Sequence, residues 1–533
     1  MGPELVSADA MAARIEDGAH VLTVGMTLSG ASETILKAIE ARFLSVGHPQ
    51  NLTLIHSAGQ SNRRDGIQHL AHEGLVGRII GAHWGLAPRW MDMISHDRVI
   101  AYCLPQGQMT HWYRSMAGGL PGHLTQIGLG TFIDPRQEGG KMNARTAAEP
   151  DLIHVVEVRG EEYLFIEAVP VHVVLIRGTT ADTAGNLAAE DEAMKLELLP
   201  AVFAARRFDG IVMAQVRQVV PRGQLNPRQV EVPGAHIHYL TVAAHPEQDH
   251  RQTASVDYAP RFSSQGFGPS LQEIEPGPLD ERRVIGRRAV LELHAGDIVN
   301  MGTGIPNDVI GPEVLSEGAG DLVTLTVESG VYGGRAWGGI DFGVAEYPDA
   351  LIEHPYQFDF YNGHGVDVTY MGFGEADASG NVNATKLGDR ATGAGGFIDI
   401  TERARTVVFC GTMTAGGLKV VVEDGRLRVE QEGTIQKWVS HVQQISFNGA
   451  RALGRGQRVL VVTERAVFQL TQAGWTLIEI APGMDPELDV IPHMAFRPTM
   501  LEPPVMMPPV VYEEARLELV ARLTTGEAKD RHG

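Results

Sequence analysis

The 533-residue sequence lacks any apolar run that approaches the ~20 residues of a membrane-spanning helix. Its first stretch, MGPELVSADAMAARIEDG, carries four acidic residues and no apolar core of signal-peptide length. Positive charge is also in short supply, because 44 Lys and Arg stand against 65 Asp and Glu, a formal net charge of -21. Nucleic acids and anionic membranes attract clustered positive charge, so we expect neither as a partner. These features together predict a cytoplasmic protein.

Cysteine is scarce as well. Cys103 and Cys410 both lie in apolar stretches, AYCLP and TVVFCG, which favours two buried thiols over a disulfide. There are 21 histidines, and a structural zinc on His236 and His238 is a weaker alternative, since no Cys joins them and neither HExxH nor CxxC occurs. A Gly-x-Ser-x-Gly nucleophile motif is absent too. We therefore expect no bound metal and no serine-hydrolase chemistry.

Short β-branched and aliphatic runs alternate with amphipathic stretches along the chain. This alternation predicts an α/β fold with largely parallel sheets. A chain of this length exceeds a single hydrophobic core, so two or more domains are expected. Strands are predicted at 20–25, 173–178, 210–216, 322–327, 406–411 and 458–463, and helices at 33–43 and 190–205.

An internal repeat suggests how the chain is divided. The sequence ADTAGN at 181–186 recurs as ADASGN at 376–381, and each copy follows a strand-like run. Residues 260–285 between the two copies are rich in Pro, Gly, Ser and charge, which is typical of a linker. The repeat therefore predicts two halves of similar layout, a domain at 1–275 and a second at 286–533.

Glu328 is the most informative polar residue. In LTVESGVYGG, at 325–334, an apolar strand ends at Val327 and leads directly into a glycine-rich turn. Burying a carboxylate costs several kcal/mol without a partner, and open α/β sheets bind ligands at the carboxyl ends of their strands. A functional carboxylate and a structural Glu that caps a helix or pairs with Arg335 are equally compatible with these residues.

Two glycine-rich loops and one restrained amide have the character of binding groups. The stretch VNMGTGIPN at 299–307 lacks the third Gly and the distant acidic residue of a dinucleotide site, which argues against nicotinamide binding. The loop GAGGFID at 393–399 can aim backbone N–H groups at an anion or an oxyanion. Gln106 lies between a proline and a glycine in LPQGQM, where its amide could donate to an oxyanion or serve only as a turn residue.

These motifs, in this order, resemble the family I coenzyme A transferases, and most closely the single-chain acetate, propionate or short-chain acyl-CoA enzymes. The resemblance runs through nearly the whole chain, in LPQGQM, GLGTFIDPR, VVLIRGTTADTAGN, TVESG, HPYQFDFYNGHGVD, ADASGNVNATKLGDR and GAGGFIDIT. It implies that the halves correspond to the α and β subunits that some relatives carry as separate chains. Each half would be a Rossmann-like CoA-transferase domain, with the site at their interface. A homodimer or homotetramer is also implied.

The resemblance further implies a role for each candidate residue. Glu328 would be the nucleophile that forms a glutamyl-CoA thioester, and Gln106 with the backbone N–H of Gly395 or Gly396 would form the oxyanion hole. Coenzyme A is implied as a substrate and not as a permanently bound cofactor. Its expected contacts lie on the second half, at Gly302, Gly304, Pro306, Asn381, Lys386 and Phe397.

The implied reaction exchanges CoA between a short-chain acyl-CoA and a free carboxylic acid, with ping-pong kinetics. Two alternatives are an acyl-CoA hydrolase on the same scaffold and a non-catalytic acyl-CoA-binding subunit. Relatives that act on succinate and 3-oxoacids carry Ser-Glu-Asn-Gly where this chain has Val-Glu-Ser-Gly at 327–330, which places it with the short-chain acyl group. The N-terminal signature Gly-Gly-Phe is replaced by Val-Gly-Met at 24–26, and Gly-x-Pro by Gly-Ala-Ser at 30–32. The resemblance therefore does not assign the residues on the first-half side of the pocket.

Overall fold

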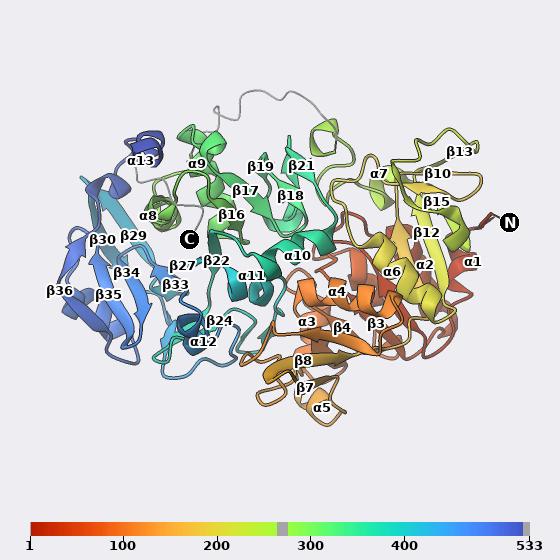
Figure 1. Ribbon diagram of the computed structural model, residues 1–533, viewed down its shortest axis with the longest axis horizontal. Coiled ribbons are helices and arrows are strands. Elements are labelled where there is room, and N and C mark those ends of the chain that lie inside the picture. The colour runs from red at the N-terminus through yellow and green to blue at the C-terminus, as the bar shows by residue number, and fades with distance from the viewer. Residues whose placement is uncertain (1, 264–275, 526–533) are drawn as a thin grey trace.

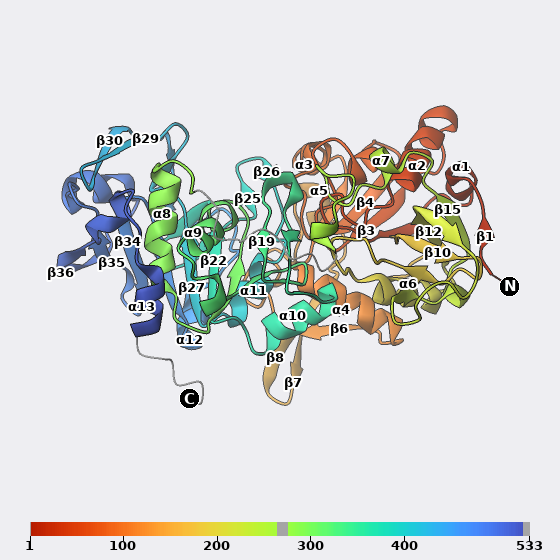
Figure 2. The same cartoon turned by 90° about the horizontal axis from the view of Figure 1, so that it is seen from above.

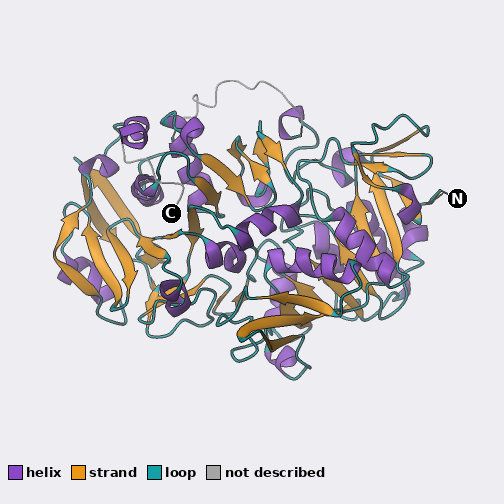
Figure 3. Ribbon diagram, in the orientation of Figure 1, coloured by secondary structure: helices purple, strands orange, loops and turns teal. Residues whose placement is uncertain are grey.

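A computed structural model describes residues 2–263 and 276–525 of the chain. Each half holds a large sheet with helices packed around it, and the two halves lie side by side along the long axis of the molecule (Figure 1). Figure 3 shows that helices and strands alternate through both halves, as the sequence predicts. The expected linker at 260–285 falls partly on 264–275, outside the described residues. Within the described residues, no helix has both the length and the apolar character needed to span a membrane.

The sheet of the first half is parallel throughout. Its order is β1-β15-β12-β9-β2-β3-β4-β5. Every side chain of β3 and β9 is buried, as expected for parallel strands that are covered on both faces. The strands are β1 (Glu4–Leu5), β2 (His20–Thr23), β3 (Leu52–His56), β4 (Val76–Gly81), β5 (Ile100–Cys103), β9 (Val173–Arg177), β12 (Ile211–Val216) and β15 (Tyr239–Val242).

The sheet of the second half has the same parallel centre, extended by antiparallel pairs on both sides and by a parallel last pair, β35 with β36. Its order is β21-β18-β17-β16-β22-β27-β33-β34-β35-β36, in which β17 through β33 run parallel and hairpins extend the sheet at both ends. The central order β17-β16-β22-β27-β33 matches β3-β2-β9-β12-β15 of the first half, so the two halves repeat one topology. The strands are β16 (Ile298–Met301), β17 (Thr324–Val327), β18 (Val331–Tyr332), β21 (Ala350–Leu351), β22 (Val368–Gly372), β27 (Thr406–Cys410), β33 (Arg458–Val462), β34 (Ala466–Thr471), β35 (Gly474–Ile480) and β36 (Thr499–Met506).

The repeated sequence motif builds the same turn twice. In the first copy the Asp182 carboxylate accepts the Ala184 and Asn186 backbone N–H groups and the Asn186 side-chain amide. In the second copy Asp377 accepts the equivalent hydrogen bonds, including one from the Asn381 amide at 3.2 Å. The turns follow β10 (Thr180–Asp182) and β23 (Glu375–Asp377), which lie in small side sheets. The internal repeat is therefore confirmed.

Helices cover the sheets and meet between the halves. In Figures 1 and 2, α10 of the second half lies beside α4 of the first, in the middle of the molecule. The helices are α1 (Ala8–Ala12), α2 (Glu33–Val46), α3 (Pro88–Ser95), α4 (Gln106–Ala117), α5 (Ala144–Ala147), α6 (Leu198–Arg207), α7 (Pro246–Asp249), α8 (Glu281–Ala289), α9 (Gly311–Ser316), α10 (His354–Gly363), α11 (Phe397–Arg403), α12 (Gly449–Gly454) and α13 (Leu519–Thr525).

One helix prediction is wrong in its first half. The expected helix at 190–205 begins only at Leu198, as α6. The preceding segment turns inward instead, because the buried Glu192 receives a hydrogen bond from Arg177 Nε at 3.0 Å. Pro200 then lies in the first turn of the helix, where its missing N–H is tolerated.

Cys103 and Cys410 are both free and buried, as predicted. Burial raises the pKa of the Cys103 thiol to about 12, with a weak opposing effect from the Ala394 backbone N–H. Both cysteines are therefore packing residues of the described structure.

Backbone and side-chain hydrogen bonds join the two halves. The buried Asp399 carboxylate of α11 accepts the Gly107 N–H at 2.9 Å and the Gln108 amide at 2.6 Å, both from the first turn of α4. Farther along the interface, the Phe132 N–H donates to the Ile445 carbonyl at 2.8 Å. The halves are thus fixed in register where β5 leads into α4.

Candidate active site

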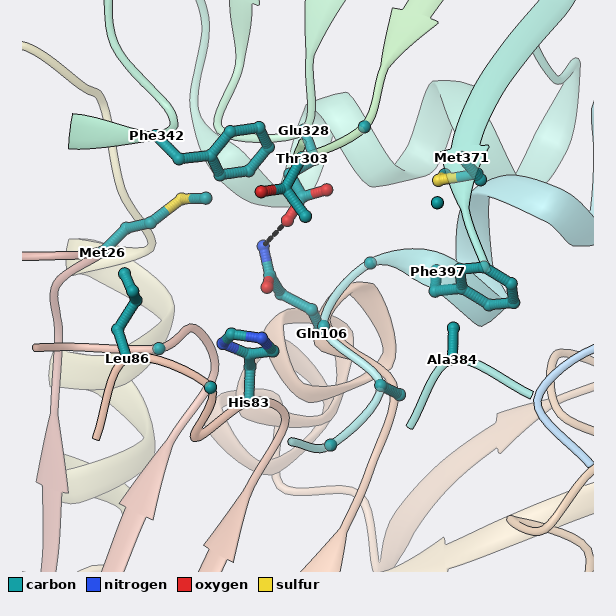
Figure 4. A pocket seen from close by; sticks show the side chains of 18 of the residues that line it. Met26, His83, Leu86, Gln106, Thr303, Glu328, Phe342, Met371, Ala384 and Phe397 are labelled. Atoms are coloured by element: carbon teal, nitrogen blue, oxygen red, sulfur yellow. Dashed lines mark hydrogen bonds between the residues drawn. The ribbon is translucent and has the colours of Figure 1, made fainter. Parts of the chain in front are cut away.

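A cavity of about 440 Å³ lies between the halves and receives side chains from both. Figure 4 shows the carboxylate of Glu328 and the amide of Gln106 facing each other inside it. Apolar side chains gather on either side of this pair, with Met26, Leu86 and Phe342 on one side and Met371 and Phe397 on the other. The first half also contributes Thr27, Gly59, Arg63, His83 and Gly85, and the second half Gly302, Thr303, Gly339, Gly372, Phe373, Gly374, Ala384, Leu387, Gly393, Ala394, Gly395 and Gly396.

Glu328 directly follows β17, at the carboxyl end of the parallel sheet. The chain can turn away after it because Gly330 has a φ of +100°, and a Cβ there would come within 2.1 Å of the Ile352 carbonyl oxygen. The Glu328 side chain is only 8% exposed, and its Oε1 accepts a hydrogen bond from Gln106 Nε2 at 3.1 Å. Its described partner is therefore a cavity residue from the other half of the chain, and the pairing with Arg335 is not made.

Burial raises the pKa of Glu328 to about 7, while the nearby His354 and the hydrogen bond from Gln106 oppose this shift. Removing the carboxylate from water disfavours its charged form, while an N–H donor favours that form. Near neutral pH the group therefore exists as both acid and carboxylate. A weakly solvated carboxylate is a stronger nucleophile than an exposed one, which suits covalent catalysis.

Gln106 is held at the start of α4 by contacts with the second half. Its backbone N–H donates to the Gly395 carbonyl at 2.9 Å. Its side-chain Nε2 lies 3.1 Å from Glu328 Oε1 and 3.0 Å from His354 Nε2. An amide nitrogen carries two hydrogens and can donate to both acceptors at once.

The glycine loop at 393–396 places backbone against the Glu328 carboxylate. A Cβ on Gly396 would come within 2.9 Å of Glu328 Oε2 and would push the carboxylate away from this position. The Gly395 N–H donates to the Ala82 carbonyl at 2.9 Å and is already engaged. Within the described residues, the Gly396 N–H has no acceptor. Of these two N–H groups, that of Gly396 is therefore the one without a protein acceptor in the described part of the chain.

Only some of the predicted coenzyme A contacts line the cavity. Gly302 and Phe397 line the cavity, but Gly304 and Pro306 do not. Asn381 and Lys386 do not line the cavity either, and their assignment to coenzyme A stays a prediction. In the structure both side chains have protein partners. The Asn381 amide closes the turn at Asp377, and the Lys386 ammonium donates to the Met142 carbonyl at 3.1 Å.

Sequence reasoning missed the first-half wall of the cavity. Met26, which lines this wall, lies within the Val-Gly-Met stretch. That stretch departs from the family signature, so the resemblance assigned no residue here. His83 and Leu86 follow β4, at the same sheet edge as Gln106. Burial lowers the pKa of His83 to about 4, so its ring is neutral in the cavity at physiological pH.

Comparison with known proteins agrees with this geometry. A family model described as coenzyme A transferase matches residues 5–243. The chain is 40% identical over 504 residues to the caffeate CoA-transferase of Acetobacterium woodii, covering 93% of this chain and 95% of that protein. It is also 40% identical over 470 residues to the acetate CoA-transferase YdiF of Escherichia coli K12, covering 88% and 87% of the two chains.

The architecture agrees as well. The crystal structure of the acyl-CoA transferase YdiF apoenzyme from Escherichia coli O157:H7 superposes with a TM-score of 0.90 at 36% identity, and 97% of each chain is covered. A thioester complex of that enzyme with CoA superposes with a TM-score of 0.89. The chain belongs to the coenzyme A transferase family, and it has the two CoA-transferase domains of that fold. Its activity is CoA transfer.

Proposed function

We propose that this enzyme exchanges CoA between a short-chain acyl-CoA and a free carboxylic acid, with Glu328 as the nucleophile. One observation carries the proposal. The buried Glu328 carboxylate lies in a cavity between the halves, with the Gln106 amide on one oxygen and the Gly396 backbone beside the other. Such a carboxylate is placed to attack a carbonyl, and two N–H donors are placed to receive the resulting charge.

The exchange needs only carboxylate and thiolate chemistry. The Glu328 carboxylate attacks the thioester carbonyl, the C–S bond breaks, and CoA thiolate leaves an acyl-glutamyl anhydride. The thiolate then attacks the glutamyl carbonyl, releases the first carboxylate, and forms the Glu328–CoA thioester. An acceptor carboxylate reverses these steps and departs as the new acyl-CoA. Each addition places negative charge on a carbonyl oxygen.

We assign the oxyanion hole to Gln106 Nε2 and the Gly396 N–H. The Gly395 N–H is excluded because it is bound to Ala82. Donors that are already oriented stabilise the developing charge without reorganisation, and loss of one typically costs ~10²–10³ in rate.

The cavity walls favour a monocarboxylic acid with an apolar tail. Met26, Leu86 and Phe342 lie on one side of Glu328 and would surround the acyl group. Met371 and Phe397 on the other side leave a path for the pantetheine arm, and Gly302 also lines the cavity. Among the described lining residues, Arg63 carries the one positive charge, and its exposed guanidinium would meet a CoA phosphate. The names of the relatives, acetate and caffeate CoA-transferases, bracket the acid sizes to test.

The decisive experiment compares Glu328→Ala with the wild type in CoA exchange between acetyl-CoA and labelled carboxylic acids of increasing length. We expect the variant to lose exchange. After incubation with acyl-CoA, the wild type should carry a hydroxamate at Glu328 with hydroxylamine, or the corresponding alcohol with borohydride, each located by mass spectrometry. Full exchange by Glu328→Ala would refute the assignment. Thioester loss without an added carboxylate would instead identify the hydrolase alternative, and binding without turnover the non-catalytic one.

Two expectations accompany the proposal. The homodimer or homotetramer stays a prediction that analytical ultracentrifugation measures. The cytoplasmic location stays a prediction that cell fractionation measures.

A further inference from the structure

A chain of buried polar side chains continues behind Gln106, away from the cavity. Gln106 Nε2 lies 3.0 Å from His354 Nε2, and His354 Nδ1 lies 2.7 Å from Glu197 Oε2. The side chains of His354 and Glu197 are fully buried. His354 is the first residue of α10 in the second half, whereas Glu197 precedes α6 in the first half. The chain therefore crosses the domain interface twice, from Gln106 to His354 and from His354 to Glu197.

With Glu197 and Glu328 ionised, which is the state that reacts, and with the His354 ring neutral, the hydrogen bonds of this chain have one consistent arrangement. A carboxylate only accepts, so His354 Nδ1 must carry the proton that it shares with Glu197. In the neutral ring, His354 Nε2 is then an acceptor, and it takes one hydrogen of the Gln106 amide. The other amide hydrogen remains for Glu328 Oε1. The second Glu197 oxygen accepts from the Ser57 hydroxyl, so the carboxylate itself is fixed.

The arrangement prevents the Gln106 amide from flipping. A flipped amide would bring its oxygen against the lone pair of His354 Nε2 and against the Glu328 carboxylate, so that two attractive contacts would become repulsive. An unrestrained glutamine could turn its oxygen toward the cavity, where it would repel an oxyanion. Buried networks of this kind rigidify the group at their end when every member is satisfied.

The reaction itself requires no proton from the histidine. Neither the attack by a carboxylate nor the departure of a thiolate requires proton transfer at Glu328. His354 also contacts the amide of Gln106 and not a reacting atom. A general-acid or general-base role is therefore unnecessary, and orientation of the amide is the function that the contacts support.

We infer that Glu197 and His354 are positioning residues that hold the Gln106 amide with its N–H groups toward the reaction centre. This inference rests on the proposed role of Gln106 in the oxyanion hole. It concerns residues that act through Gln106, at a distance from the substrate. The same hydrogen bonds make the donor available only when the two halves are docked.

The test measures formation of the Glu328–CoA thioester in a single turnover, followed by intact mass. Glu197→Gln is the sharpest variant, because the new amide can donate to His354 Nδ1. The ring proton then moves to Nε2, where it faces the amide hydrogens of Gln106. We expect this variant and His354→Phe to slow thioester formation by ~10–10²-fold, with CoA affinity unchanged. His354→Gln, whose amide oxygen can accept from Gln106, should recover part of the rate.

The control is His250→Phe, because His250 is another buried histidine paired with a glutamate, 3.2 Å from Glu192, and it does not line the cavity. We expect it to lower the melting temperature and leave the rate of thioester formation unchanged. Rates are normalised to the fraction of chains that form thioester at completion, which removes any loss of folded protein.

A double-mutant cycle separates positioning from general destabilisation. In a Gln106→Ala background, His354→Phe should slow the reaction by less than ~3-fold, because there is no amide left to orient. Multiplicative effects, or a wild-type rate in Glu197→Gln, would overturn the inference. Failure of the wild type to form any thioester on Glu328 would instead overturn the proposed function, so the two outcomes are distinguishable.

Discussion

At the residue scale, the burial of Glu328 determines the pH range in which it can react. Burial raises its pKa to about 7, so the free enzyme holds mostly the acid below that pH and mostly the carboxylate above it. Only the carboxylate can attack a thioester. We therefore expect kcat/KM for acyl-CoA to rise about tenfold per pH unit below ~pH 7 and to level off above it, because this parameter reports ionisations of the free enzyme. Steady-state rates from pH 5.5 to 9 measure this, and a flat profile between pH 6 and 8 would contradict it.

The raised pKa of Glu328 also predicts that its ionised carboxylate destabilises the folded state. The folded pKa is raised above the ordinary value of 4.5, so the folded state binds the proton more tightly than the unfolded state does. Stability should then fall as the pH rises from about 4.5 to 7, and the ionised carboxylate should cost on the order of 3 kcal/mol above pH 7. We expect Glu328→Gln to raise the melting temperature at pH 8 and to leave it unchanged near pH 4.5. Scanning calorimetry at both pH values checks this, and an equal shift at both would exclude the electrostatic cause.

Residue-level prediction succeeded where a side chain stands at the end of an apolar strand. Glu328 follows such a strand, so its location at the sheet edge could be predicted from a few neighbouring residues. Asn381 and Lys386 could not be placed in this way, because local sequence does not show whether a polar side chain faces a ligand or its own backbone. Glu197 and His354 are 157 residues apart in sequence, and their contact arises only from the docking of the two halves.

At the scale of elements, the start of α4 controls the placement of Gln106. The Asp399 carboxylate of α11 accepts the Gly107 N–H and the Gln108 amide, in the first turn of α4, where a negative charge also suits the helix dipole. Burial raises the pKa of Asp399 to about 6 and its hydrogen bonds oppose the shift, so the group is mostly ionised at pH 7.

We expect Asp399→Ala to lower kcat and to destabilise the protein by ~2–4 kcal/mol, because it leaves two buried donors unsatisfied and α4 free to shift. Asp399→Asn, which keeps one acceptor, should be milder in both respects. Denaturant unfolding and steady-state kinetics measure the two effects. If the alanine variant kept wild-type kcat despite the lost stability, α11 would not position the oxyanion donor.

Elements were predictable where their sequence pattern is strong. The strands at β2, β9, β12, β27 and β33 lie within the expected apolar runs, since buried parallel strands have continuous aliphatic character. The helix at 190–205 was wrong in its first part because the buried Arg177–Glu192 pair holds that segment against the sheet. A tertiary contact overrode helical propensity, and such contacts are not visible in local sequence.

At the scale of the molecule, the active site is divided between two similar domains. The first half supplies Gln106 and Glu197, and the second supplies Glu328, Gly396 and His354. Neither half contains both the nucleophile and the complete set of groups that would stabilise its intermediates. The shared topology of the two sheets is consistent with the relationship to two-subunit enzymes that the sequence implies.

We therefore expect residues 1–275 and 276–533, co-expressed as separate chains, to associate and recover CoA exchange. The hydrogen bonds between α4 and Asp399, and between Phe132 and Ile445, would hold the pieces in register without a covalent link. The second piece alone should form the Glu328–CoA thioester at least ~10²-fold more slowly than the pair, since it lacks the Gln106 donor. Co-purification and intact-mass analysis measure association and thioester formation.

A pair in which the first piece carries Gln106→Ala is the matched control, because it should associate normally and remain slow. If the isolated second piece reacted as fast as the intact chain, the first half would contribute nothing to the chemistry and the interdomain site would be disproved.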